Sequence, residues 1–317
     1  MLHHFTRSIA HIALPDKFTY PFHYTPHPLC VMAADEVQVY LQHQAQWQDE
    51  LQQGKMFGVL IVQTTEGEIG YLAAFSGILA GKNIHPYFVP PIYDLLQPDG
   101  FFKKEEEHIS AINHRIRELE EDTSYQKCRQ ALEEETARCS RLLSQAKAKL
   151  KAAKELRDCR RQTEQLSESE QAAMIRESQF QKAELKRLER SLKEHLSSLQ
   201  KETDTYVSQI EALKNERKSR SATLQQQLFE QFRLLNARGE VKDLCSIFAH
   251  TVHKIPPAGA GECAAPKLLQ YAYFHHYRPV AMAEFWWGDS PKAEIRHHGH
   301  YYPACKGKCE PILGHML

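Results

Sequence analysis

The chain has 317 residues, 42% of them hydrophobic, and its 40 Lys and Arg residues balance its 40 Asp and Glu residues. This length suits about two domains of ~150 residues, and the zero net charge excludes a protein that binds polyanions over its whole surface. Apolar runs such as residues 58–62 are far shorter than the ~20 residues of a membrane-spanning helix. The N-terminus has no signal-peptide pattern, and eight cysteines are too sparse for a disulfide framework. We therefore expect a soluble cytoplasmic protein with reduced thiols and no membrane partner.

Residues 1–100 are predicted to form one part of a globular domain. Asp35 begins a capping box for a helix that is expected to run to about Gln53. Residues 57–63 and 68–75 are rich in β-branched and aromatic side chains, and the turn residues between them are typical of a β-hairpin. This segment is therefore expected to supply a helix and two paired strands.

Residues 101–238 contain neither glycine nor proline, although the whole chain has 14 and 15 of them. Apolar residues recur there in alternating steps of three and four, which is the period of a coiled-coil seam. One straight helix of this length would extend roughly 200 Å, whereas two antiparallel arms would cover each other's seam. Ser167 and Glu170 form a capping box, so the turn is expected between about Arg161 and Ser167. The second arm is expected to end at Gly239, because glycine is typical just past a helix end.

Residues 239–317 are predicted to form a second part of a globular domain. Pro266 lies where a first helical residue is expected, and the helix should reach about His276. Residues 280–287 form an apolar run typical of a buried strand, and another strand is expected over residues 293–297.

Neither flank has enough strands for a sheet of its own. We therefore predict an α+β fold, in which residues 1–100 and 239–317 together form one small mixed α/β head. Residues 101–238 are predicted to be a long antiparallel coiled-coil hairpin inserted into this head.

The C-terminal flank also holds the densest group of metal-binding and nucleophilic side chains. Zinc prefers thiolate and imidazole ligands, and its ligand pairs are often two to four residues apart. The predicted zinc ligands are Cys263, Cys305, Cys309 and either His300 or His315. The alternative is that these cysteines are small buried side chains and that the protein binds no cofactor.

Cys263 has a second interpretation, as a nucleophile. It precedes the predicted helix, where the helix dipole lowers the pKa of a thiol, and His298 or His300 would be the base. Glu284, within an aromatic run, is either a carboxyl with a raised pKa or an outward-facing strand residue. An independent thiol enzyme is therefore one alternative function, and a structural coiled-coil adaptor is another.

Three segments near the C-terminus carry a family resemblance: PPAGAGECAAPKLLQYAY at 256–273, MAEFWWG at 282–288 and YPACKGKCEPILGHML at 302–317. Together with residues 58–62, 70–77 and 88–94, they resemble the long N-terminal extension of some RluA-type RNA pseudouridine synthases. The resemblance spans nearly the whole chain, and the coiled coil is its least specific part. In that family a separate catalytic domain carries the nucleophilic Asp in a His-Arg-Leu-Asp motif, which this chain lacks.

The resemblance implies an accessory region of an isomerase that converts uridine to pseudouridine in rRNA or tRNA, with no catalytic residue of its own. The chain stops about where the catalytic domain of the family would begin, so that domain is an expected partner. The region is expected to assist RNA modification by RNA binding, because structured RNA is bound through basic and aromatic side chains. The candidate RNA contacts are Lys267, Trp286, Trp287, Arg296, Tyr301, Lys306 and Lys308.

Overall fold

A computed structural model describes residues 1–23, 25–292 and 294–317 of the chain. The fold is α+β, as predicted. The chain divides into two compact units, which we name the head (residues 1–107 and 221–317) and the hairpin unit (residues 108–220). Within the described residues, no helix is both long enough and apolar enough to cross a membrane.

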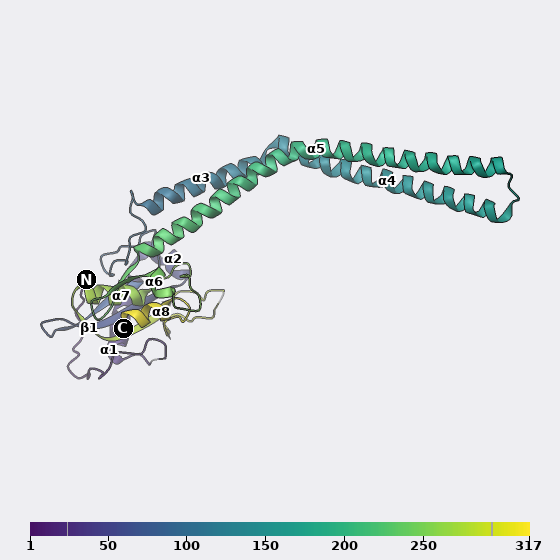
Figure 1. The fold of residues 1–317 in the computed structure, drawn as a ribbon. Helices are drawn as coiled ribbons and strands as arrows, with labels where there is room; N and C mark the ends of the chain where they lie inside the picture. Colours follow the sequence, from purple (N-terminus) through teal and green to yellow (C-terminus); the bar gives the residue numbers. More distant parts are fainter. Residues whose placement is uncertain (24, 293) are drawn as a thin grey trace. The chain divides into compact units, whose positions relative to one another are not determined.

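A four-stranded antiparallel sheet in the order β2-β1-β5-β6 forms the centre of the head (Figure 1). Its strands are β1 (Lys55–Gln63), β2 (Ile69–Phe75), β5 (Arg278–Trp287) and β6 (Tyr301–Tyr302). β1, from the N-terminal flank, pairs along its length with β5, from the C-terminal flank. The two flanks therefore complete one sheet, which confirms the predicted head.

Helices cover both faces of this sheet. α1 (Pro28–Gln42) packs on one face, and α7 (Ala264–Phe274) packs on the other. Side chains alternate between the faces of a strand, so Met282 belongs to the apolar core beneath α7 and Phe285 to the core beneath α1. By the same alternation Glu284 shares the face of Met282, which places a carboxyl in the layer beneath α7.

The head also contains a short helical segment before β1 and several small elements in its C-terminal half. These are η1 (Ala45–Trp47), α2 (Gln48–Gln52), β3 (Arg233–Leu235), β4 (Val241–Asp243), α6 (Leu244–Phe248) and α8 (Cys309–Met316). The core beneath α7 includes residues from β3, α6 and α8, so these elements close one side of the head.

Three details predicted for the head are wrong: the start and the end of the first helix, and the last strand. α1 ends at Gln42 rather than near Gln53, and the separate helical segments η1 and α2 follow it. α1 begins at Pro28 rather than after Asp35, because proline is pre-organised for a first helical turn and the ring of His27 accepts the backbone N–H of Leu29 at 3.3 Å. Residues 294–297 form no strand, and Ala293, the first residue of that prediction, lies outside the described residues. The strand that pairs with the far edge of β5 is β6.

Three helices make up most of the central region: α3 (Phe101–Glu121), α4 (Thr123–Thr163) and α5 (Glu168–Gln231). Polar contacts join α3 and α4 to α5. The pairs are Glu120–Lys214, Glu135–His195, Lys147–Glu189 and Arg157–Gln181. Partner numbers fall along α5 as they rise along α3 and α4, which is antiparallel order, so the predicted hairpin is confirmed (Figure 1).

The turn of the hairpin lies where the capping box predicted it, between Thr163 and Glu168. The first arm is interrupted at Asp122, whose carboxylate accepts the N–H groups of Ser124 and Tyr125 at 2.8 and 3.0 Å and thereby caps α4.

The predicted end of the second arm at Gly239 is wrong. α5 ends at Gln231, and the following residues form β3, which pairs with β4. Gly239 lies between these strands with φ at +84°, a conformation that a tight turn and a helix end both require of glycine.

Candidate metal centre

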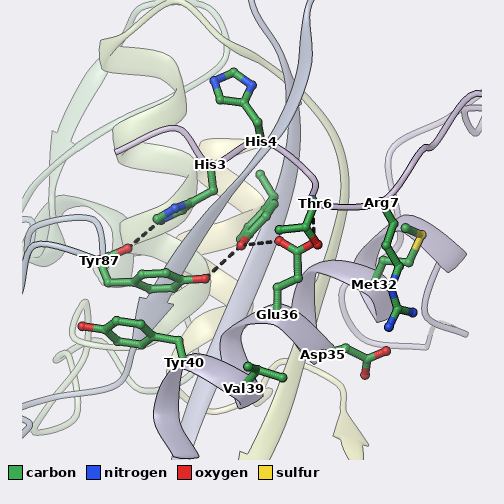
Figure 2. A pocket seen from close by; sticks show the side chains of 11 residues that line it. His3, His4, Thr6, Arg7, Met32, Asp35, Glu36, Val39, Tyr40 and Tyr87 are labelled. Carbon is green, nitrogen blue, oxygen red and sulfur yellow. Dashed lines mark hydrogen bonds between the residues drawn. The ribbon is translucent and has the colours of Figure 1, made fainter. Parts of the chain in front are cut away.

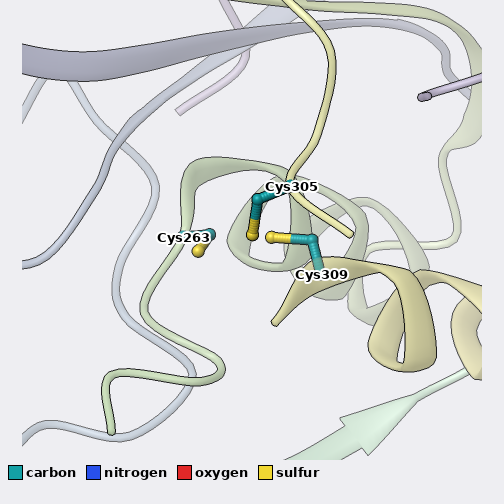
Figure 3. A group of neighbouring side chains, drawn as sticks. All are labelled: Cys263, Cys305 and Cys309. Carbon is teal, nitrogen blue, oxygen red and sulfur yellow. The ribbon is translucent and has the colours of Figure 1, made fainter. Parts of the chain in front are cut away.

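Three cysteines from two distant segments meet in the head (Figure 3). The Sγ atoms of Cys263, Cys305 and Cys309 all lie within 4.8 Å of one another. Cys263 directly precedes α7, and Cys309 is the first residue of α8. The structure therefore brings together three of the four zinc ligands predicted from the sequence.

The predicted fourth ligand, His315, is not part of this cluster, so that assignment is wrong. Its Nε2 atom lies 3.0 Å from the backbone oxygen of Leu234. His315 follows Cys309 by six residues on α8, which turns its side chain about 120° around the helix from that of Cys309. The alternative ligand, His300, also lies outside the cluster, and its ring packs against that of His297 at 5.3 Å.

The three thiols differ in how readily they ionise. Hydrogen bonds from the thiols of Cys263 and Cys309, and then from the backbone N–H groups of Cys309 and Lys308, lower the pKa of Cys305. The hydrogen bond to Cys305 and then burial raise the pKa of Cys263. Cys305 is therefore the first member of the cluster to become a thiolate. Cys263 is held as a thiol, which does not favour it as a nucleophile.

His298 does not serve Cys263 as a base in this structure. Its Nδ1 accepts the backbone N–H of Gly288 at 3.0 Å, and its ring packs against Trp287 with the centroids 4.1 Å apart. The nucleophile interpretation therefore lacks an acidic thiol, and the Nδ1 atom of His298 is already occupied.

Glu284 lies beneath α7 with only 4% of its surface exposed. Its Oε1 accepts the backbone N–H of Ala265, two residues after Cys263, at 3.3 Å. Burial raises the pKa of Glu284 to about 7. Of the two interpretations of this residue, the structure favours the buried carboxyl over the outward-facing one.

The close approach of α7 to the sheet at this point depends on Gly58, which pairs with Glu284 across β1 and β5. A Cβ atom at Gly58 would lie 2.9 Å from the Cβ of Ala264 and 3.5 Å from the Cγ of Glu284. A larger residue would push the start of α7 away from the sheet. Gly58 thus holds the carboxyl and the first turn of α7 together.

Lys267, a predicted RNA contact, is a second buried charge in this layer, with 3% of its surface exposed. Its Nζ donates to the backbone oxygens of Phe75 at 2.9 Å and Gly77 at 3.4 Å, and it lies 5.0 Å from the centre of the Phe75 ring. Burial lowers the pKa of Lys267 to about 8. Lys267 therefore joins α7 to the end of β2 and is not accessible to RNA.

Two further predicted RNA contacts are also buried. Trp286 and Trp287 have 8% and 6% of their surfaces exposed, so neither ring offers a free face on which a base could stack. The Arg296 guanidinium lies 5.2 Å from the Trp286 ring. These tryptophans contribute to packing, because β5 is covered on both faces.

The remaining candidates are closer to the surface. Arg296 is partly exposed and pairs with Glu294 at 2.8 Å, and Tyr301 is half-buried. Lys306 is exposed, and Lys308 is partly exposed. The two lysines lie in the short segment between Cys305 and Cys309, so a basic loop borders the cysteine cluster.

A cavity of about 450 Å³ lies beside α1 and the N-terminal segment (Figure 2), and no sequence motif predicted it. Three of its polar side chains bind one another: the Tyr71 hydroxyl donates to Glu36 Oε2 at 3.0 Å, and the Thr6 hydroxyl donates to Glu36 Oε1 at 2.7 Å. Tyr87 stacks on Tyr40 with the ring centroids 3.8 Å apart. The Glu36 carboxylate is thus already hydrogen-bonded, and the cavity offers a ligand aromatic contact together with the exposed side chains of Arg7 and Asp35.

The fold and the cysteine cluster define an α+β protein with a candidate metal centre at the starts of two helices. The chain matches no protein-family model, no curated protein and no solved structure. Its function is therefore inferred from its own residues and their geometry.

Proposed function

We propose that this chain is an accessory region of an RNA pseudouridine synthase, that it assists the binding of structured rRNA or tRNA, and that it does not isomerise uridine by itself. The main support is the position of the segments that resemble the family. Residues 58–62, 70–77, 256–273, 282–288 and 302–317 belong to β1, β2, α7, β5 and α8 or their immediate flanks. These elements pack together in one head. The proposal includes a cytoplasmic location and a synthase catalytic domain as partner.

The basic loop between Cys305 and Cys309 is the RNA contact that this proposal favours. Lys306 and Lys308 are at least partly exposed, and lysine binds the phosphate backbone without sequence preference. Lys267, Trp286 and Trp287 are buried and are therefore not proposed as RNA contacts. Arg296 and Tyr301 remain in the proposal, but on different faces: Arg296 lies over the Trp286 and Tyr302 rings, whereas Tyr301 packs against the core beneath α1.

A binding measurement with a labelled tRNA transcript tests this proposal. The double variant Lys306→Ala/Lys308→Ala should bind the transcript more weakly. The slope of log binding constant against log salt concentration should become shallower by the amount expected for about two lost phosphate contacts. Lys242→Ala removes another exposed lysine of the head and is the matched control, which should bind like the wild type. A wild-type chain that does not bind RNA, or a double variant that binds normally, would contradict the proposal.

The structural adaptor is a second candidate, because the hairpin unit exposes large apolar side chains. Leu156 and Phe180 are each 64% exposed, and Ile175 is 50% exposed. An exposed apolar patch marks a surface for a protein partner. If RNA does not bind, and a protein partner is retained by the wild type but lost with Phe180→Ser, the adaptor is favoured.

A further inference from the structure

The sulfur atoms of the cysteine cluster are spaced for a single metal ion. With zinc–sulfur bonds of about 2.3 Å, two ligands of a tetrahedral ion lie about 3.8 Å apart. The Sγ atoms of Cys263, Cys305 and Cys309 all lie within 4.8 Å of one another (Figure 3). A disulfide would join only two of these atoms, whereas one ion can bind all three. The geometry therefore favours a metal over an oxidised pair.

The backbone around Cys263 is fixed on both sides of this residue. The Gly77 N–H donates to the backbone oxygen of Glu262 at 3.0 Å, which holds the loop before α7 to the end of β2. The Ala265 N–H donates to the buried carboxyl of Glu284 at 3.3 Å, which holds the first turn of α7 to β5. Cys263 thus offers its sulfur from a backbone that is already in place, as a preorganised ligand should.

Cys305 and Cys309 belong to one tight turn. The Cys309 N–H donates to the backbone oxygen of Cys305 at 3.2 Å. The N–H groups of Lys308 and Cys309 also donate to the Cys305 sulfur, and such hydrogen bonds orient a thiolate ligand. Two cysteines with three residues between them have the spacing of a zinc ligand pair. The turn therefore presents two ligands together.

The number of ligands indicates which metal the cluster suits. Thiolates select zinc, monovalent copper and iron–sulfur clusters. Iron–sulfur clusters are usually held by four cysteines, whereas residues 1–23, 25–292 and 294–317 supply three ligating side chains at this spacing. Zinc accepts three protein ligands with water as the fourth. Cys305 is exposed, so solvent reaches this side of the cluster.

We propose that Cys263, Cys305 and Cys309 bind one Zn²⁺ ion whose fourth ligand is water, and that this ion ties the loop between Cys305 and Cys309 to the start of α7. The ligands come from residues 249–263 and 303–308, which form no helix or strand, and from the first residue of α8. Zinc stabilises such segments because its binding is coupled to their folding. This role of the metal does not rest on the proposed RNA binding.

The metal is tested first, on the full chain purified without a metal-affinity tag and dialysed against zinc chloride and then buffer. Elemental analysis should find about one zinc per chain, and Cys305→Ser should reduce this about tenfold or more. Cys245→Ser and His315→Ala are matched controls in the head and should retain the zinc. Circular dichroism establishes that each variant is folded. A folded wild type without zinc, or a Cys305→Ser variant that retains it, would overturn the proposal.

The ligand set is tested by X-ray absorption at the zinc edge. The expected shell has three sulfur atoms at about 2.3 Å and one oxygen at about 2.0 Å. A shell with four sulfur atoms, or with fewer than three, would refute the three-cysteine site. A histidine ligand, which is recognised by scattering from the outer atoms of its ring, would refute water as the fourth ligand.

The tie between the loop and α7 is tested by limited digestion with trypsin. Lys306 is exposed and Lys308 is partly exposed, so trypsin can cleave after either lysine once the loop opens. A zinc-selective chelator should speed this cleavage about tenfold, because release of the metal frees both ends of the loop. Added zinc should restore the original rate. The matched site is Arg7, which lies beside α1 on the other face of the sheet.

Cleavage after Arg7 should proceed at the same rate with and without zinc. If the chelator leaves cleavage after Lys306 and Lys308 unchanged, the ion does not tie the loop to α7. If it speeds cleavage after Arg7 to the same extent, the metal stabilises the whole head and the local role is refuted. Zinc content, the ligand shell and digestion are all measured without RNA, so their outcome is separate from that of the tRNA-binding experiment.

Discussion

Lys267 should leave a clear signature in the pH dependence of stability, because its ammonium group is buried at the start of α7. Burial lowers its pKa from 10.5 to about 8. Between these two pH values the unfolded chain binds a proton that the folded chain does not bind. Stability therefore rises with pH across this window, and the full cost of the buried charge is present below about pH 8.

The size of this effect follows from the shift in pKa. A tenfold change in a proton-binding constant corresponds to about 1.4 kcal/mol, so lowering the pKa of Lys267 from 10.5 to about 8 changes the free energy of unfolding by about 3 kcal/mol. The side chain is only 3% exposed, so solvent screening reduces this value little. Lys267→Met keeps the length of the side chain and removes the titration, together with the hydrogen bonds to Phe75 and Gly77.

Urea denaturation of the wild type and Lys267→Met at intervals from pH 7 to pH 10.5 measures the effect. The free energy of unfolding of the wild type should gain about 3 kcal/mol relative to the variant across this range. Other titrating groups, such as the buried tyrosines, are present in both proteins and cancel in the difference. Lys242→Met, at an exposed position, should show no such divergence. If the difference in free energy of unfolding between the wild type and Lys267→Met does not change with pH, Lys267 is not a buried titrating cation.

Three further predictions concern the hairpin unit and the metal. Leu150 and Leu185 line one groove between α4 and α5, so spin labels at these positions should lie within about 25 Å of each other. A continuous helix would separate them by ~50 Å, and double electron–electron resonance measures the distance. Ser167→Ala removes the hydroxyl of the capping box, which accepts the Glu170 N–H at 3.4 Å and donates to Glu170 Oε2 at 2.6 Å. It should lower the free energy of unfolding of the full chain by about 1 kcal/mol, while Ser208→Ala within α5 should not lower it. Chelation of zinc from the wild type should lower its thermal midpoint, because zinc binds only the folded cluster; an unchanged midpoint in zinc-loaded protein would contradict this.

The hairpin could be predicted because its signals are local. A stretch without glycine or proline, a seam in steps of three and four, and a capping box at Ser167 each act within a few residues. The break at Asp122 was missed because a carboxylate cap needs no glycine or proline and resembles the many acidic residues around it. The end of α5 was misplaced because Gly239 suits a helix end and a β-turn equally well.

The site could be predicted only in part, because its parts differ in how far apart they are in the sequence. Cys305 and Cys309 are close together, and their spacing alone indicated a ligand pair. His315 follows Cys309 by six residues, so it was also a candidate. Its exclusion depends on the helical geometry of α8, in which a change of two residues in spacing turns a side chain by about 200°. The position of Cys263 beside this pair depends on how α7 and α8 pack, which no local pattern specifies.

Glu284 could not be placed from its neighbours, because β5 is covered by α1 on one face and α7 on the other. A strand of this kind reads as a continuous apolar run, so alternation gives no sign of which side a single carboxyl takes. The pairing of Glu284 with Gly58 decides the matter, since only a glycine leaves room for the carboxyl and α7 together. A buried carboxyl with a raised pKa and a buried lysine with a lowered one both reduce stability near neutral pH. Both groups lie around the first turn of α7, close to the three cysteines. Such buried charges, which an apolar core would not need, are expected at a functional site.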